Sequence, residues 1–202
     1  MTPRLVEIGL AERTRAGETH SGDRCVVARA GSRVLIGVID GVGHGSEAAQ
    51  AAAVAAAVLE KHPREPVDAL MLRCHEKLRE TRGAAITLVA IEGATGALEW
   101  VGAGNVSAAL QQVEPFGLPA TRELLVRSGA CGASLPSTRA SQLPMARGDT
   151  LVIATDGVHR KFVDDIVGSE PPQRLADRLL SRYGTSLDDS LVVVARLRAP
   201  EP

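Results

Sequence analysis

The chain has 202 residues, with 23 Lys and Arg against 24 Asp and Glu, which gives a formal net charge of −1. A chain so close to neutral offers no electrostatic case for a nucleic acid or an anionic membrane as partner. Aromatic residues make up 2% of the chain, too few for platforms that stack bases. The length fits one domain, which we place at residues 1–198, with residues 199–202 as a frayed tail.

The sequence also bears on where the protein acts. No charge-free apolar run reaches the length of a membrane helix, and the first residues lack the apolar segment of a signal peptide. Cys25, Cys74 and Cys131 are odd in number and show no metal-ligand spacing, which favours reduced thiols. We therefore expect a cytoplasmic monomer without a membrane partner.

The predicted elements begin with a hairpin. Strands rich in Val and Ile flank Gly31-Ser32, a turn pair typical of hairpins. Downstream, periodicity and breaker residues predict helices at 46–61, 66–80, 159–167 and 172–184 and strands at 84–92, 97–104, 106–113, 149–155 and 190–197. The segment 114–145 is weakly patterned. The order predicts one α/β (α+β) domain of mostly antiparallel sheet with helices in pairs.

A glycine turn follows the hairpin and leads into the first helix. Its sequence, "VIDGVGHG" at 38–45, has the strand-turn-helix layout of a phosphate-binding loop. It lacks the Lys and Ser or Thr of a Walker loop and the Gly-x-Gly-x-x-Gly spacing of a dinucleotide site. One alternative is an ordinary turn whose glycines permit positive φ. The acid Asp40 at the mouth of the turn would repel phosphate, so it needs a separate explanation.

Other acids stand at comparable positions. Asp156, like Asp40, ends an apolar strand and is followed by Gly-Val, whereas Asp23 and Asp188-Asp189 begin strands. In a hairpin centred on Gly31-Ser32, Asp23 lies directly opposite Asp40, with Cβ atoms roughly 5 Å apart. Two antiparallel helices after Asp156 return the chain to the end that it left, which places Asp188 near Asp156.

Carboxylates gathered at one sheet edge repel one another unless a cation lies between them. Oxygen donors without His or Cys at ligand spacing indicate a hard divalent ion, Mg²⁺ or Mn²⁺. In this interpretation Asp40 binds a metal ion, and the ion in turn binds phosphate. Two such ions could activate a water and polarise a phosphoryl group. The alternative is that these acids cap turns and strand ends, as Asp before Gly often does.

The motifs resemble those of a known family. "SGD" at 21–23, "VIDGVGHG", "ATDGV" at 154–158 and "DDSLVVV" at 188–194 are similar, in order, to motifs of the metal-dependent protein phosphatases of the protein phosphatase 2C superfamily, and best to its SpoIIE-like bacterial branch. The resemblance implies a four-layer αββα sandwich of two antiparallel sheets flanked by paired helices. It also implies hydrolysis of phosphoserine or phosphothreonine by water activated at a binuclear Mn²⁺ or Mg²⁺ centre.

The same resemblance assigns the site residues. Asp40 should bridge two ions, the carbonyl of Gly41 should bind the first ion, and Asp23, Asp156 and Asp188 should serve the second; Asp40 and Asp156 form the catalytic pair. Asp188 is chosen over Asp189 because the family uses the first Asp of the terminal pair. Asn105 stands where many eukaryotic members have an Asp for a third ion, which puts a third ion in doubt. Either Arg13 or Arg15 could grip the phosphate.

The resemblance also indicates partners. A free-standing catalytic domain with "DGVGHG" is most similar to the RsbX type, the feedback phosphatases of the stressosome, so phosphorylated STAS-domain proteins are the expected substrates. The alternatives are an anti-anti-sigma-factor phosphatase of the RsbU type and a non-catalytic binding module on the same fold. For docking of the phosphoprotein we expect Arg122, Arg127 and Arg139 or, failing these, the surface around His159 to Phe162.

Overall fold

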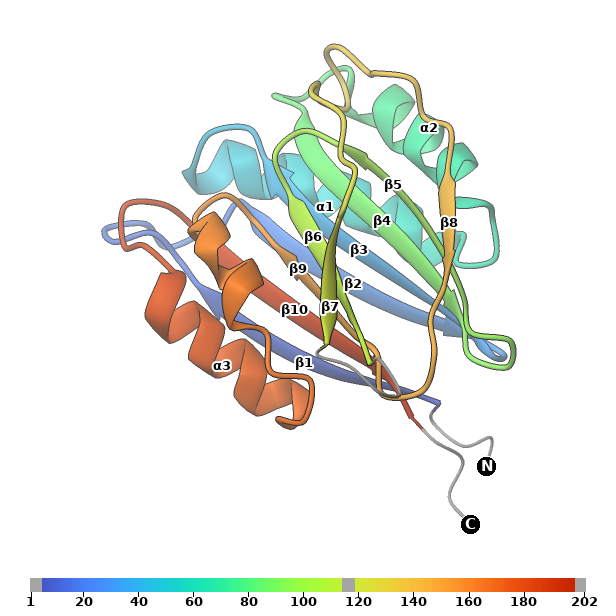
Figure 1. Ribbon diagram of the computed structural model, residues 1–202. Coiled ribbons are helices and arrows are strands. Elements are labelled where there is room, and N and C mark those ends of the chain that lie inside the picture. Colours follow the sequence, from blue (N-terminus) through green and yellow to red (C-terminus); the bar gives the residue numbers. More distant parts are fainter. Residues whose placement is uncertain (1–4, 114–118, 199–202) are drawn as a thin grey trace.

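The computed structural model describes residues 5–113 and 119–198, and these form two five-stranded sheets (Figure 1). Sheet I has the order β1 (Val6–Arg13), β10 (Ser190–Leu197), β9 (Thr150–Ala154), β6 (Ser107–Gln112) and β7 (Ala120–Leu124). Sheet II has the order β2 (Asp23–Ala30), β3 (Arg33–Gly41), β4 (Ala84–Glu92), β5 (Ala97–Ala103) and β8 (Ser141–Pro144). Neighbouring strands in both sheets are antiparallel, as predicted.

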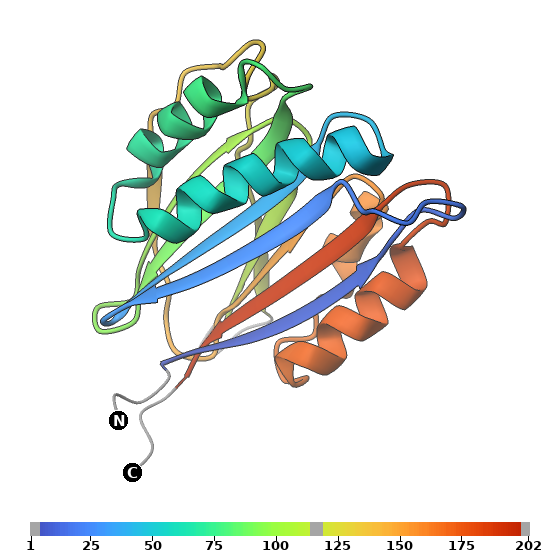
Figure 2. The same cartoon turned by 180° about the vertical axis from the view of Figure 1, so that it is seen from behind.

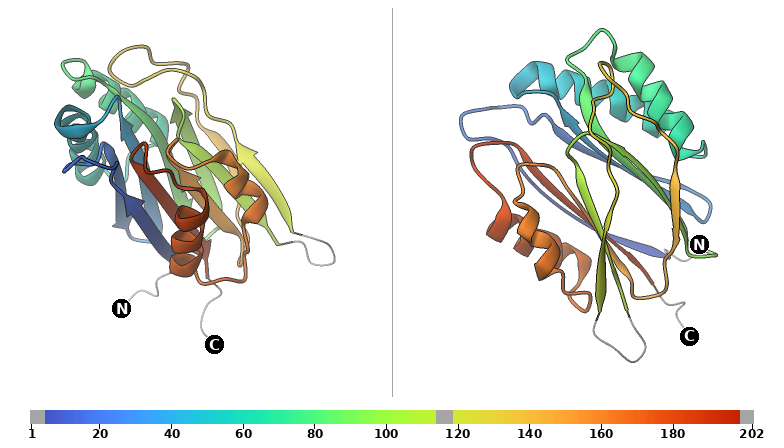
Figure 3. Two further views of the ribbon diagram at one scale, coloured as in Figure 1. Left: turned by 90° about the vertical axis from the view of Figure 1, so that its left-hand side faces the viewer. Right: turned by 45° about the horizontal axis from the view of Figure 1, so that its top comes forward.

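Helices cover the outer face of each sheet, which confirms the predicted four-layer sandwich (Figures 2 and 3). Helices α1 (Gly45–Lys61) and α2 (Val67–Leu78) pack on sheet II. Helix α3 (Pro172–Tyr183) and the short 3-10 helix η1 (Arg160–Asp165) pack on sheet I. No helix among the described residues is long and apolar enough to cross a membrane.

Alternation along the strands builds the apolar layers. On β3, Val34, Ile36 and Val38 point into the cluster between the two sheets, whereas Leu35 and Ile39 belong to the cluster beneath α1 and α2. This two-residue period is what a strand buried on both faces requires. A third cluster fills the space between sheet I and α3. The core therefore holds both sheets rigidly, and their ends can position side chains.

Several elements differ from the sequence prediction. Residues 159–167 form only the six-residue η1, in which Phe162 is buried. A segment this short gains too few hydrogen bonds to offset the cost of nucleating an α-helix. Strand β1 is not predicted from the sequence, since it is an edge strand whose charged residues face solvent. Strands β7 and β8 lie within the weakly patterned segment 114–145. The predicted tail 199–202 lies outside the described residues.

The glycine turn between β3 and α1 requires its glycines. A Cβ on Gly41 would lie 2.2 Å from the carbonyl oxygen of Ala48, so a side chain there would push α1 away from the sheet. Gly43 and Gly45 have φ of 93° and 73°, a region that favours glycine. The turn thus starts α1 directly above the end of β3, and it leaves Asp40 at the edge of the sheet.

Candidate metal-binding active site

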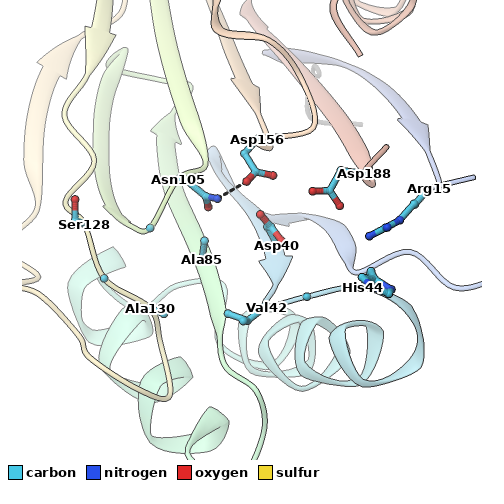
Figure 4. A pocket seen from close by; sticks show the side chains of 13 residues that line it. Arg15, Asp40, Val42, His44, Ala85, Asn105, Ser128, Ala130, Asp156 and Asp188 are labelled. Carbon is cyan, nitrogen blue, oxygen red and sulfur yellow. Dashed lines mark hydrogen bonds between the residues drawn. The ribbon is translucent and has the colours of Figure 1, made fainter. Parts of the chain in front are cut away.

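Three of the predicted acids line one pocket. In the hairpin, Asp23 is the direct partner of Asp40, as the register predicted. Asp156 follows β9, and Asp188 precedes β10, the strand that pairs with β9. Asp40, Asp156 and Asp188 line a pocket of about 580 Å³ between the ends of the two sheets, and their carboxylates face one another (Figure 4).

Asp23 and Gly41 lie behind this pocket and are absent from its described lining. Asp23 is buried, with 8% of its surface exposed, and its Oδ2 accepts a hydrogen bond of 2.6 Å from the hydroxyl of Thr155. The same hydroxyl oxygen accepts the backbone N–H of Leu191 at 2.9 Å. The N–H of Gly41 donates to the carbonyl of Gly22. Asp23 therefore stands between the pocket and the interface of the two sheets.

The structure separates the two acids of the terminal pair. Asp188 is partly exposed and lines the pocket. Asp189 is 3% exposed, and its two carboxylate oxygens accept the backbone N–H groups of Arg15 at 2.8 Å and Gly22 at 2.7 Å. Asp189 thus fixes the loop between β1 and β2, whereas the carboxylate of Asp188 faces the pocket. This arrangement supports the choice of Asp188 over Asp189.

Burial and crowding perturb the acids. Burial raises the pKa of Asp40 to about 8, and the charge of Asp23 adds to the effect. Burial also raises the pKa of Asp23 to about 7, although the hydrogen bond from Thr155 opposes the rise. The pKa of Asp156 is raised by burial and then by the charge of Asp188. Acids that retain protons in this way release them when a cation binds, so the site is chemically matched to a cation.

The donor set fits a hard divalent ion, because carboxylate oxygens surround the pocket. As the side chains stand, however, no group of three His, Cys, Asp or Glu residues among those described is arranged to hold an ion. Two of the acids accept hydrogen bonds from neighbouring side chains, Asp23 from Thr155 and Asp156 from Asn105.

Arg15, His44 and Asn105 complete the polar lining of the pocket (Figure 4). Arg15 lies beside the acids in the described lining, whereas Arg13 is absent from it and its Nη1 donates to the carbonyl of Gly184. His44 Nδ1 lies 2.7 Å from Glu18 Oε1.

Sequence reasoning missed two supports of the acids. Nδ2 of Asn105 donates to Oδ2 of Asp156 at 2.6 Å, so the amide orients an acid of the pocket. Thr155, which holds Asp23, gave no signal beyond its place before the Asp-Gly-Val motif.

Comparison with known proteins identifies the family. The family model of stage II sporulation protein E (SpoIIE) matches residues 30–198. The chain belongs to this family. It is thus a serine/threonine phosphatase domain of the protein phosphatase 2C type. The match covers four of the five predicted metal-binding positions, Asp40, Gly41, Asp156 and Asp188, and begins after Asp23.

Individual relatives agree with this family. The phosphoserine phosphatase RsbX of Bacillus subtilis (strain 168) is 22% identical over 180 residues, which cover 89% of this chain and 88% of RsbX. A structure of RsbX in complex with magnesium superposes with a TM-score of 0.85 at 21% identity, covering 98% of each chain. A chain solved in work on the bacterial stressosome, a modular system adapted to control secondary messenger signalling, gives a TM-score of 0.84 at 28% identity, covering 95% of this chain and 99% of the other.

Proposed function

We propose that this phosphatase hydrolyses phosphoserine and phosphothreonine in STAS-domain proteins of a stressosome, using two Mg²⁺ or Mn²⁺ ions. The observation that carries the proposal is the pocket of Asp40, Asp156 and Asp188 beside Arg15 in a member of the SpoIIE family. Anionic side chains alone would repel a phosphate group, so their gathering at a phosphatase pocket calls for cations.

Each residue of the proposed site has a distinct role. Asp40 would bridge the two ions, the carbonyl of Gly41 would bind the first, and Asp23, Asp156 and Asp188 would bind the second. When bound, the ions supply an activated water and polarise the phosphoryl group. Arg15 is placed to bind phosphate oxygens through its guanidinium. Asn105 and Thr155 hold Asp156 and Asp23 through hydrogen bonds of 2.6 Å each.

The proposed substrate and setting rest on the relatives. The similarity to RsbX and to a chain from a stressosome study supports a phosphorylated STAS-domain protein as substrate. The absence of a membrane-spanning helix among the described residues is compatible with a cytoplasmic protein. Both described sheets share one core, which supports a single catalytic domain over residues 1–198. We propose that this domain acts as a monomer.

One experiment tests the function and its alternatives. Purified protein is offered a panel of phosphorylated STAS-domain proteins with Mg²⁺, with Mn²⁺ or with EDTA, and phosphate release is measured. Release from scaffold proteins that depends on the ions supports the proposal. Release only from an anti-anti-sigma factor would favour the RsbU type, and equal rates after exhaustive chelation would contradict metal dependence. Failure with every phosphoprotein and every small ester would point to a non-catalytic module.

A further inference from the structure

A second hollow continues the catalytic pocket. It has a volume of about 760 Å³ and shares Gly104, Asn105, Ser128 and Asp156 with the pocket of the acids. We call it the β7–η1 groove. One wall comes from the end of β7 and the residues after it, Glu123–Val126, and the other from Val158–Arg160 after β9. The groove therefore starts at Asp156 and leads away from it between two separate segments of the chain.

The walls of the groove combine exposed apolar and charged side chains. Leu125, the residue directly after β7, is 64% exposed and offers an apolar surface in the wall of the groove. Its carbonyl accepts the indole N–H of Trp100 at 3.2 Å, which fixes the backbone of this wall. Arg160 on η1 forms an ion pair with Glu123 on β7 at 2.5 Å, so the two walls are tied together across the groove. Both charged side chains are more than half exposed.

We propose that the β7–η1 groove binds the polypeptide segment next to the phosphorylated residue of the substrate. The inference rests on the proposed function. A phosphoserine side chain is short, so the substrate backbone must pass over the rim of the pocket while its phosphate reaches the acids. The rim at Asn105 and Asp156 is also the mouth of the groove. An apolar side chain of the substrate segment packs on Leu125, and polar groups of the same segment contact Glu123 and Arg160.

This location differs from the docking surface that the sequence predicted. Arg127 and Arg139 line another small hollow, which shares Leu125 with the groove, and Arg122 is absent from the described lining of both. The alternative surface that begins at His159 does contribute, because His159 and Arg160 form one wall. The groove thus joins part of the weakly patterned segment with the residues after Asp156, and the three arginines are absent from its described lining.

The test separates docking from chemistry. Leu125→Ser removes the exposed apolar contact, and Leu72→Ser serves as its matched control because Leu72 is 48% exposed on α2, far from the groove in sequence and fold. We expect Leu125→Ser to raise KM for a phosphorylated STAS-domain protein about fivefold to tenfold. Hydrolysis of p-nitrophenyl phosphate should be unchanged, since this small ester needs no docking surface. Leu72→Ser should behave like the parent with both substrates.

Two results would overturn the groove proposal. One is a Leu125→Ser variant with the parent's KM for the phosphoprotein, and the other is an equal loss with both substrates, which would show a disturbed pocket. The parent itself reports on the proposed function: if it hydrolyses p-nitrophenyl phosphate but no phosphoprotein, the substrate class is wrong. Binding of the phosphoprotein to Asp40→Asn with and without Leu125→Ser gives a second readout, and about fivefold weaker binding is expected with the added change.

Discussion

The hydroxyl of Thr155 donates a hydrogen bond of 2.6 Å to Oδ2 of Asp23, and this bond joins sheet I to sheet II behind the active site. Thr155 is 1% exposed and Asp23 is 8% exposed, so water competes little with the bond. The hydroxyl oxygen also accepts the N–H of Leu191, so one side chain satisfies a buried acid and a buried amide. A site residue is thereby held by the packing of the whole sandwich.

Thr155→Val should therefore destabilise the fold and weaken ion binding. The valine has nearly the same shape but leaves the buried N–H of Leu191 without its acceptor, which costs about 1–3 kcal/mol of unfolding free energy. The loss of the donor also raises the pKa of Asp23 further, so Mg²⁺ affinity near neutral pH should fall. Urea unfolding and calorimetric Mg²⁺ titration measure the two effects. Thr155→Ser keeps the hydroxyl and should restore most of both; equal behaviour of the two variants would contradict this role.

Asp40→Asn should abolish nearly all turnover while leaving the protein folded. Asp40 faces Asp23 across the hairpin and lines the pocket with Asp156 and Asp188, so removing its charge removes the proposed bridging ligand and relieves repulsion. We expect kcat to fall about a thousandfold or more, with a melting temperature in EDTA equal to or above that of the parent. A variant with the parent's kcat would make Asp40 an ordinary turn residue.

Asp188→Asn and Asp189→Asn should fail in different ways. Asp188 lines the pocket, so Asn there should lower kcat and ion affinity with little change in stability. Asp189 accepts two backbone N–H groups, and the amide of Asn would turn a donor toward one of them. Asp189→Asn should therefore lower the free energy of unfolding by about 1–3 kcal/mol. Activity assays and urea unfolding on both variants distinguish them, and the reverse pattern would show that Asp189 is the ligand.

The hairpin register is a local property, and the sequence therefore predicted the Asp23–Asp40 pair from Gly31-Ser32 alone. The approach of Asp188 to Asp156 followed from counting elements, even though η1 is shorter than the predicted helix. Thr155 and Leu125 could not be found in the same way. Their roles depend on contacts between segments far apart in the chain, which neither periodicity nor turn residues encode. The N–H groups that donate to Asp189 belong to the loop between β1 and β2, for which the sequence shows no pattern.

The pH dependence of the ion-free protein follows from the raised pKa values. In the fold Asp23 and Asp40 have pKa values of about 7 and 8, above the 3.8 of an unperturbed Asp. Between about pH 4 and pH 8 the folded state therefore binds more protons than the unfolded chain. The raised pKa values of the two acids stabilise the fold fully below about pH 4, and this stabilisation is lost as the pH rises through 7 and 8. In EDTA, the melting temperature should fall from about pH 6 to about pH 9.

Two comparisons check this interpretation. Saturating Mg²⁺ should reduce the fall, because the ion binds the deprotonated acids and stabilises the fold most at high pH. Asp40→Asn should have a shallower fall in EDTA, since it removes the group with the highest of these pKa values. A melting temperature that rises with pH in EDTA would show that other groups dominate.

Arg15→Ala should impair every phosphate ester to a similar degree. The guanidinium lines the pocket beside the acids, and a contact with phosphate is shared by all substrates. The backbone N–H of Arg15 still donates to Asp189 in the variant, so the loop should stay in place. We expect KM to rise about tenfold for both p-nitrophenyl phosphate and a phosphoprotein, with Arg15→Lys between the variant and the parent.

Arg13→Ala is the matched control, because its guanidinium donates to the carbonyl of Gly184 and the residue is absent from the described lining of the pocket. Steady-state kinetics with both substrates should leave Arg13→Ala close to the parent. A loss confined to the phosphoprotein in Arg15→Ala would mean that Arg15 contacts the substrate protein and not its phosphate. Unchanged kinetics in Arg15→Ala would leave the ions alone to hold the phosphate group.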